Sequence, residues 1–330
     1  MVSSKPTSPR IPGKAELGLR VTMRIEDATG PRDLVGILLS PISIQKRDGS
    51  IVGFDPNTIR TWRIVISPSQ RAGTGAPRTT RIRQLDDACA LTWPAEESTW
   101  FGAWLLRTSK GGGFRANSAL PTGSSPYGEP SMAVDEAVAY VQRHFHDRGL
   151  PAVVQVSLPI YGSLDDLLAL RGWETALSIK VLVADASDVE RLTPHHDFHI
   201  IVQNSPSTEW LALQPDEESA PSIMRYPSEF AHIFAESQLI AGGRIAYTED
   251  WGVISCISVR EKQHPKGAGQ ALVRALAASA LAHGVSHLAL EVDAEDTAQI
   301  VHYESLGFRF HHEYRHRREP LMAETRSVAG

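Results

Sequence analysis

Cysteine is scarce in this sequence, which has two in 330 residues, Cys89 and Cys256. They lie far apart, and this usage excludes a disulfide-rich scaffold and favours a reducing compartment. Cys256 lies in an apolar, strand-like stretch, where a core position is expected rather than a nucleophile. The sequence also lacks an apolar run of transmembrane length and the apolar core of a signal peptide. These absences predict a soluble, cytoplasmic protein without a membrane partner.

A strong net charge is missing as well. The chain has 33 Lys and Arg against 38 Asp and Glu, for a formal net charge of −5. This balance argues against nucleic-acid binding or membrane-surface binding by the whole chain. Four arginines do gather in and just after the Ser/Gly/Pro-rich stretch Pro68–Thr80, namely Arg71, Arg78, Arg81 and Arg83. Because so few arginines make few phosphate contacts, a solvated linker is favoured over a nucleic-acid arm.

Apolar residues are ample, at 42%, and the length suits two or three domains with sizeable cores. The pattern predicts an α+β protein in which a small SH3-like β-barrel precedes two mixed-sheet α/β units. The expected segments are a disordered tail at 1–14, the barrel at 15–67, a linker at 68–85, a first unit at 86–186, a second unit at 187–318 and a C-terminal tail at 319–330.

Five short strand-like runs predict the barrel, with Asp48-Gly49 as a tight hairpin turn. The runs are Leu19–Ile25, Leu34–Leu39, Ile42–Lys46, Ile51–Phe54 and Ile59–Val65. In the first unit, Ala103–Arg107 and Arg115–Leu120 are expected to pair as strands around a glycine turn.

The two larger units repeat one pattern. Each ends as strand, helix, glycine with a following aromatic residue, and strand. These elements are Val153–Leu158, Leu164–Leu170, Gly172-Trp173 and Leu177–Val183 in the first unit, and His287–Val292, a helix after Asp296, Gly307-Phe308 and Phe308–Tyr314 in the second. Two divergent copies of one unit are therefore expected.

Gly267-Ala-Gly269 stands between the strand-like run Trp251–Val259 and the helical run Gln270–Ala282. Amides freed at such a turn, together with the positive end of the helix dipole, suit a phosphate group. The first copy has no such glycine pair. It is therefore expected to have a structural or substrate-shaping role.

A second pattern follows, Asp296-Thr-Ala-Gln-Ile-Val-His-Tyr303-Glu-Ser-Leu-Gly307-Phe308. Together with the glycine pair it resembles the GCN5-related N-acetyltransferase (GNAT) superfamily, with its motifs Arg/Gln-x-x-Gly-x-Gly/Ala and Asn-x-x-Ala-x-x-Leu-Tyr-x-x-x-Gly-Phe. The whole chain resembles an actinobacterial group with an N-terminal SH3-like module and tandem GNAT folds. The strings that support this closer likeness are Trp104-Leu-Leu-Arg107, Arg115-Ala-Asn-Ser118 and His311-His-Glu-Tyr-Arg315.

The resemblance implies acetyl-CoA as co-substrate and a small-molecule or peptide amine as acceptor, which attacks directly in a ternary complex. It assigns the pyrophosphate to Lys266, Gly267, Ala268, Gly269 and Gln270, and the pantetheine to the backbone of Ile257, Ser258 and Val259. The pantetheine site requires this strand to splay from Leu288–Val292. His264 replaces the family's Arg or Gln, and Asp296 replaces its Asn while still capping the helix with Gln299 at the capping-box position.

The resemblance also assigns Tyr303 as the general acid for the CoA thiolate, because its spacing after Asp296 matches the family's tyrosine. A packing role in an amphipathic helix is the alternative for Tyr303. Glu291 and Glu249 are the possible general bases, near the two strands of the expected cleft, and an exposed strand-end carboxylate is the alternative for each.

No metal is expected, because neither histidine group has a ligand spacing typical of a metal site. The groups are His195, His196 and His199, and His311, His312 and His316. His311 and His312 alternate on a strand, so they should not face one site. Two other functions stay open: a catalytically weak GNAT pseudo-enzyme that binds acyl-CoA as a regulator, and an adaptor that binds a protein partner through the SH3-like module.

Overall fold

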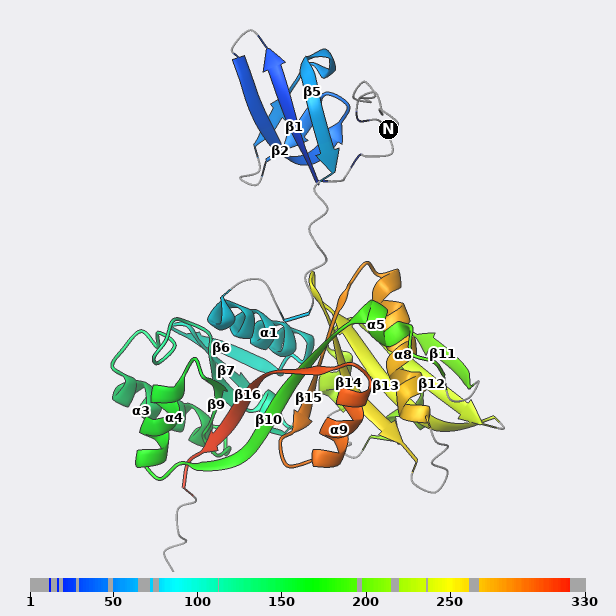
Figure 1. Ribbon diagram of the computed structural model, residues 1–330. Helices are drawn as coiled ribbons and strands as arrows, with labels where there is room; N and C mark the ends of the chain where they lie inside the picture. The colour runs from blue at the N-terminus through cyan, green and yellow to red at the C-terminus, as the bar shows by residue number, and fades with distance from the viewer. Residues whose placement is uncertain are drawn as a thin grey trace, which may run out of the picture. The chain divides into compact units, whose positions relative to one another are not determined.

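The computed structural model describes two compact units, residues 1–70 and 71–330 (Figure 1). The described residues are 12, 17, 20–27, 30–46, 50–64, 72–73, 77–111, 113–194, 198–214, 220–235, 237–260 and 267–320.

The first unit is a five-stranded antiparallel sheet in the order β4-β3-β2-β1-β5. Its elements are β1 (Arg20–Asp27), β2 (Gly30–Ser40), β3 (Ser43–Gln45), β4 (Ile51–Gly53), the 3-10 helix η2 (Pro56–Thr58) and β5 (Ile59–Ile64). Alternate residues such as Val21, Met23 and Ile25 point into one core, as period-two strands require. The five predicted strands are confirmed. The sheet order leaves β4 and β5 as its edges, so a closed SH3-like barrel stays a prediction.

The second unit contains one large mixed sheet of 11 strands, in the order β11-β12-β13-β14-β15-β10-β16-β9-β8-β7-β6. The strands are β6 (Glu97–Phe101), β7 (Trp104–Thr108), β8 (Ser118–Pro121), β9 (Val153–Leu158), β10 (Glu174–Asp185), β11 (His199–Gln203), β12 (Ser228–Ala235), β13 (Gln238–Tyr247), β14 (Trp251–Val259), β15 (His287–Asp293) and β16 (Arg309–Arg318).

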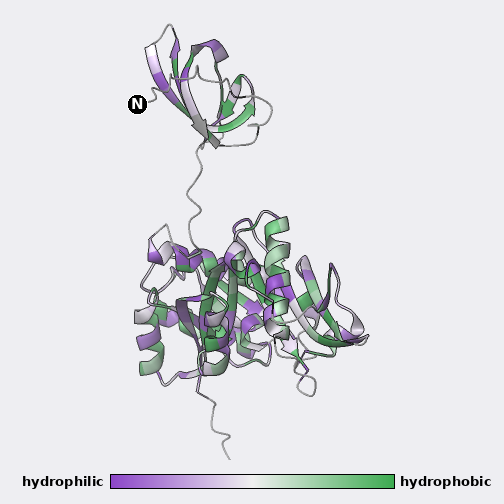
Figure 2. Cartoon of the chain, turned by 45° about the vertical axis from the view of Figure 1, so that its right-hand side comes forward, coloured by the Kyte–Doolittle hydropathy of each residue, from purple (hydrophilic) through white to green (hydrophobic). Residues whose placement is uncertain are grey.

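Helices cover both faces of this sheet. They are α1 (Arg78–Thr92), α2 (Gly113–Ala116), α3 (Val134–His146), α4 (Gly162–Leu170), α5 (Ala186–Glu190), α6 (Thr208–Leu211), α7 (Ala220–Met224), α8 (Ala268–Ala282) and α9 (Thr297–Ser305). Hydrophobic colouring follows many of the strands, whereas the helices carry both kinds of residue, as expected for elements with one buried face (Figure 2).

The two sequence copies exchange their last strands. β10, from the first copy, pairs with β15 of the second, and β16, from the second, pairs with β9 of the first. β10 and β16 also pair with each other at the centre of the sheet. Each copy keeps one parallel pair, β8 with β9 and β14 with β15. The copies are therefore repeats that share one sheet.

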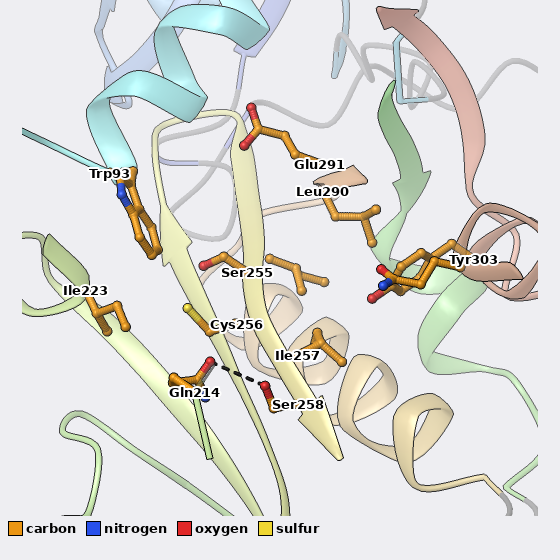
Figure 3. Close-up of a pocket in the computed structure, with 12 residues that line it drawn as sticks. Trp93, Gln214, Ile223, Ser255, Cys256, Ile257, Ser258, Leu290, Glu291 and Tyr303 are labelled. Carbon is orange, nitrogen blue, oxygen red and sulfur yellow. Dashed lines mark hydrogen bonds between the residues drawn. The ribbon is translucent and has the colours of Figure 1, made fainter. Parts of the chain in front are cut away.

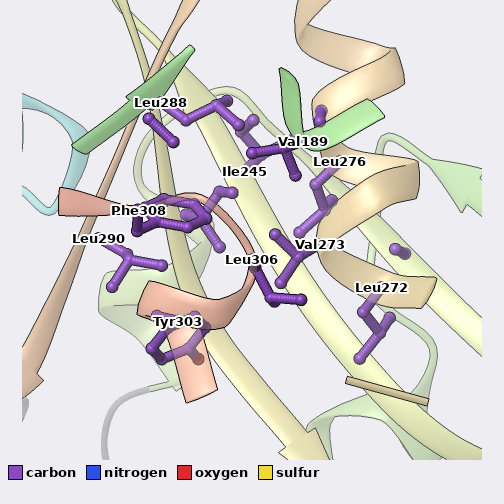
Figure 4. Packing of buried hydrophobic residues seen from close by; sticks show 14 of the residues in the cluster. Val189, Ile245, Leu272, Val273, Leu276, Leu288, Leu290, Tyr303, Leu306 and Phe308 are labelled. Atoms are coloured by element: carbon purple, nitrogen blue, oxygen red, sulfur yellow. The ribbon is translucent and has the colours of Figure 1, made fainter. Parts of the chain in front are cut away.

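Separate hydrophobic clusters lie on the two faces around β14. On one face, α8 and α9 pack on β13, β14 and β15 in a cluster that Figure 4 shows at close range. Its labelled members are Val189, Ile245, Leu272, Val273, Leu276, Leu288, Leu290, Tyr303, Leu306 and Phe308. The other face carries two clusters, one with Leu85 of α1 and one with Trp93, Trp210 and Ile223.

Two elements differ from the sequence prediction. Helix α1 begins at Arg78, inside the stretch assigned to a linker, because Ile82, Leu85 and Cys89 form a helical apolar stripe that the arginine-rich composition obscured. Arg115 lies on the short helix α2 rather than on a strand, so the predicted strand begins only at Ser118. Both helices contribute residues next to the functional site.

Candidate functional site

Strands β14 and β15 part in the middle of the sheet. Their parallel pairing runs from Trp251 with His287 to Ile254 with Leu290, while β14 continues to Val259. A bulge bends β14 at this point: its register with β13 shifts between Gly242 and Arg244, and Cys256 has a φ of 57°. Beyond Ile254, one backbone edge of β14 therefore turns away from β15, the splay that the pantetheine site requires.

A cavity of about 280 Å³ lies where the strands part (Figure 3). Its lining residues are Trp93, Gln214, Ile223, Ile254, Ser255, Cys256, Ile257, Ser258, Leu290, Glu291, Gln299 and Tyr303. Tyr303 and Leu290 belong to the cluster on one face of the sheet, whereas Trp93 and Ile223 belong to a cluster on the other. The cavity is therefore lined from both faces, so two molecules could meet in it from opposite sides.

Helix α8 begins next to the point where β14 and β15 part, and Gly267 is its N-cap residue, with a φ of 93°. Residues at the start of a helix have no intrahelical partner for their N–H groups, so Ala268, Gly269 and Gln270 present amides there. A Cβ on Gly269 would lie 3.4 Å from Nε2 of His302, so the surface at this turn has little spare room. His264 and Lys266 lie outside the described residues.

Tyr303 is buried and lines the cavity, with its ring edge-on to Phe308. Burial, reinforced by the charge of Asp296, raises the pKa of the Tyr303 phenol to about 12. The phenol is therefore protonated at neutral pH and can donate a proton. Asp296 caps α9 by accepting from the N–H of Gln299 at 2.9 Å, as predicted.

Of the two carboxylates proposed as bases, Glu291 lines the cavity and Glu249 does not. Glu291 is ion-paired with Arg115 of α2 and accepts a hydrogen bond from the Tyr314 hydroxyl at 3.0 Å. Glu249 is exposed in the turn between β13 and β14, before the paired part of β14. The geometry brings Glu291, and not Glu249, together with Tyr303.

Two arginines lie on the Trp93 side of the cavity, Arg244 buried and Arg115 partly buried, and the sequence patterns did not assign either of them to the site. The indole ring of Trp93 contacts two guanidinium groups, with Cζ of Arg115 at 4.9 Å and Cζ of Arg244 at 5.4 Å from the ring centre. Arg244 is fully buried and donates to the carbonyl of Thr92 at 2.8 Å, at the negative end of α1. The sequence did contain one indication of Arg244, because an arginine is unusual inside an apolar strand such as Ile240–Tyr247.

Burial lowers the pKa of Arg107 and Arg244 to about 10, so both guanidinium groups still carry charge at neutral pH. Arg107 donates to the side chains of Ser118 and Gln155, each at 2.7 Å. Neither arginine has a carboxylate partner among the described residues. Burial also raises the pKa of the Cys256 thiol, so this cavity residue is a thiol and not a thiolate.

The prediction that His311 and His312 face different sites is wrong. A bulge in the pairing of β16 with β10 places both in the interior, where their Nδ1 atoms lie 2.8 Å apart. His312 also contacts Asp86 of α1, with 3.0 Å between Nε2 and Oδ1. His195 and His196 lie outside the described residues, and within the described part of the chain no three potential metal ligands gather. No helix in that part is long and apolar enough to span a membrane.

Solved structures place this architecture in a known class. A GCN5-related N-acetyltransferase from Kribbella flavida aligns with a TM-score of 0.57 at 13% identity, over 73% of this chain and 96% of that one. A tandem GNAT protein from the clavulanic acid biosynthesis pathway aligns with a TM-score of 0.52 at 11% identity, over 78% and 92%. Such low identities establish the fold alone. The fold, with its parted parallel strands, is therefore the GNAT fold in a tandem arrangement.

Sequence comparison then gives the family. The probable histone acetyltransferase Rv0428c of Mycobacterium tuberculosis is 30% identical over 315 residues, which cover 91% of this chain and 94% of that protein. The family described as "Probable histone acetyltransferase Rv0428c C-terminal" matches residues 79–317. The chain belongs to this family and is an acetyltransferase of the GNAT type.

Proposed function

We propose that this protein transfers an acetyl group from acetyl-CoA to a primary amine by direct attack in a ternary complex, at a centre in the unit predicted at 187–318. The observation that carries the proposal is the cavity between β14 and β15, which is lined from both faces of the sheet. One face offers a buried tyrosine and the other a carboxylate, the two groups that the chemistry needs.

On the Tyr303 face, the unpaired edge of β14 would hold the pantetheine through the backbone of Ile257, Ser258 and Val259. The first-turn amides of α8 would hold the pyrophosphate, aided by the helix dipole. A β14 N–H near Val259 would polarise the thioester carbonyl.

On the other face, the Glu291 carboxylate would attract the ammonium form of the acceptor and take its proton, directly or through water. The free amine would then attack the thioester carbon, and the carbon–sulfur bond would break. The departing thiolate would take the phenolic proton of Tyr303, which is protonated at neutral pH. The neutral thiol of Cys256 favours this direct route over a covalent acyl-cysteine.

The first test is Gly267→Glu, which would place a side chain and a negative charge in the phosphate cradle at a position with a φ of 93°. We expect loss of the thermal stabilisation by CoA and a rise of roughly a hundredfold in the KM for acetyl-CoA. Gly284→Glu is the matched control, because it makes the same change at another positive-φ glycine, at the opposite end of α8. Retained CoA stabilisation in Gly267→Glu would remove the cradle from the proposal.

The second test is Tyr303→Phe, which removes the proton donor and keeps the ring packed on Phe308. We expect kcat to fall roughly a hundredfold while CoA binding changes little, because only the departing thiolate needs the proton. Release of CoA thiol with a panel of amines measures this. Tyr140→Phe, whose ring stacks on Phe101, is the control. Equal kcat in Tyr303→Phe and the wild type would exclude the acid role.

A further inference from the structure

Two side chains meet at the point where β14 and β15 part. The parallel pairing ends at Ile254 with Leu290, so Ser255 and Glu291 are the first residues beyond it on the two strands. Residues in register on neighbouring parallel strands point to the same face of a sheet, and successive residues alternate between the faces. Ile254 and Leu290 belong to the cluster on the α8 face, so Ser255 and Glu291 both point to the opposite face. Both of them line the cavity.

Arg244 is a buried cation that the proposed mechanism does not use, and it lies directly opposite Ser255 in the pairing of β13 with β14. Its Nη1 donates to the hydroxyl oxygen of Ser255 at 3.2 Å, and its Nη2 donates to the carbonyl of Thr92 at 2.8 Å. The side chain is fully buried. Burial of a cation is costly, so its bond to a hydroxyl group that lines the cavity indicates a role in the site.

The contact with Arg244 determines how the Ser255 hydroxyl can act. An N–H of a cation occupies a lone pair of the hydroxyl oxygen, which polarises the O–H bond and makes the hydroxyl a stronger donor and a weaker base. The other neighbour of this hydroxyl is the thiol of Cys256, whose sulfur is a weak acceptor. An oxygen that gains negative charge is a much better acceptor than this sulfur. The Ser255 hydroxyl is therefore suited to stabilise an oxyanion in the cavity.

We infer that the Ser255 hydroxyl donates to the carbonyl oxygen of the thioester, and that Arg244 positions and polarises this hydroxyl. The inference rests on the proposed acetyl transfer. It places the donor at the parting point of the two strands, in place of the backbone N–H near Val259. The reacting carbon lies between the base and the acid of the proposed mechanism, and Figure 3 shows Ser255 near the centre of the lining residues, with Glu291 on one side of it and Tyr303 on another.

The hydroxyl acts without giving up its proton. When the amine nitrogen bonds to the thioester carbon, the π-electron pair of the C=O bond moves onto the oxygen, and the Ser255 O–H stabilises that charge. When the carbon–sulfur bond breaks, the pair returns to form the C=O bond of the amide, and the sulfur takes the phenolic proton of Tyr303. Because the hydrogen bond is strongest while the oxygen carries the charge, it raises kcat more than it strengthens acetyl-CoA binding.

The infrared band of bound acetyl-CoA tests the contact without turnover. A heavy-isotope label in the acetyl carbonyl separates the C=O stretch of the bound thioester from the protein bands, and a hydrogen bond to the oxygen lowers its frequency. We expect Ser255→Ala to move this band to higher frequency, whereas Ser255→Thr, which keeps the hydroxyl, should leave it near the wild-type value. An unchanged band in Ser255→Ala would overturn the inference and leave the polarisation to the backbone near Val259.

Kinetics measure the size of the effect. We expect Ser255→Ala to lower kcat roughly a hundredfold for the best amine, while the Kd of CoA from calorimetry changes little. Ser228→Ala is the matched control, because Ser228 is a partly buried serine on β12 of the same sheet and does not line the cavity. An equal kcat in Ser255→Ala and the wild type would overturn the inference, as would a loss confined to the KM of the amine.

A double-mutant cycle tests the role of Arg244. Arg244→Met should lower kcat about tenfold in the wild-type background and much less in the Ser255→Ala background, because the guanidinium acts through the hydroxyl. Equal losses in the two backgrounds would overturn the positioning role of Arg244. If Arg244→Met does not fold, the band and the kcat of Ser255→Ala still decide the inference.

The infrared measurement also separates the two proposals. If no amine releases thiol, the proposed acetyl transfer fails, and the band of bound acetyl-CoA in Ser255→Ala still decides whether the hydroxyl contacts the carbonyl oxygen. If acetyl-CoA does not bind to the wild type, both proposals are overturned.

Discussion

Burial determines how the individual residues of the site can act. The same desolvation keeps the Tyr303 phenol and the Cys256 thiol protonated and lowers the pKa of the Arg244 guanidinium without neutralising it. Tyr303 could be proposed from its match to the family's motif, and Glu291 from its place on a strand of the expected cleft. Trp93 and Arg244 could not, because they become neighbours only when the end of α1 packs on β13.

The buried imidazole of His316 has a strongly lowered pKa, because burial disfavours its charged form. It is buried between Phe114 and Tyr314, and neither ring nitrogen has a hydrogen-bond partner among the described residues. Burial, with the charges of Arg107 and Arg115, lowers the pKa of His316 to about 3. In the unfolded chain a histidine takes up a proton near pH 6.5.

We expect His316→Phe to weaken the pH dependence of stability. Between about pH 6.5 and pH 3 the unfolded wild type binds a proton at His316 that the folded protein does not bind. The free energy of unfolding therefore decreases as the pH is lowered through this window, by up to about 1.4 kcal/mol per pH unit from this residue. Urea unfolding at pH 7.5, 6.5 and 5.5 measures the difference, which should grow in favour of the variant as the pH falls. Parallel stability curves would contradict this assignment.

At the scale of elements, the bulge that opens the cavity lies beside a tightly packed glycine. Trp210 of α6 donates from Nε1 to the carbonyl of Ala231 at 3.1 Å and covers Gly242 of β13. A Cβ on Gly242 would lie 2.5 Å from that Nε1 atom. The close approach of the indole holds α6, and with it Gln214, against the bulged strands.

We expect Gly242→Ala to destabilise the fold by roughly 1–3 kcal/mol, because the added methyl group overpacks a fully buried indole. The free energy of unfolding in urea measures it. Gly162→Ala is the control, because Gly162 lies in α4 with nothing within 4 Å of a new Cβ, and there the change should be neutral or slightly stabilising. Equal stability of Gly242→Ala and the wild type would mean that Trp210 moves freely.

Most elements of the second unit follow from sequence periodicity. The helical spacing from Val134 predicts α3, and the alternation from His287 predicts β15. The register shifts escape such an analysis, because a bulge is set by pairing with another strand. The bulges at Cys256 and His311 therefore belong to the tertiary structure, and one of them shapes the cavity.

At the scale of the whole molecule, the strand exchange makes the two copies interdependent. β16 lies between β10 and β9, so each copy supplies a central strand to the half-sheet of the other. Arg115 of the first copy also pairs with Glu291 of the second, so the site itself draws on both. A copy expressed alone would expose unpaired strand edges and an uncovered apolar face.

We therefore expect residues 71–330 to fold and release CoA thiol like the full chain, whereas 71–186 and 187–330 alone do not fold. The unit 71–330 is compact by itself, and its sheet is continuous across residue 186. Thermal melts followed by circular dichroism, with thiol release as the second readout, measure this. Co-expression of the two halves should restore both signals. A cooperative melt with activity from 187–330 alone would show that the exchange is dispensable.

The sequence by itself determined the glycine cradle, the capped helix that carries Tyr303 and the repetition of one unit, because each depends on residues close together in the chain. Only the tertiary structure decided that the copies exchange strands, that β14 bends from β15, and that Trp93 contacts the guanidinium groups of Arg115 and Arg244. Those features arise from contacts between distant segments, whose register and packing local periodicity does not encode.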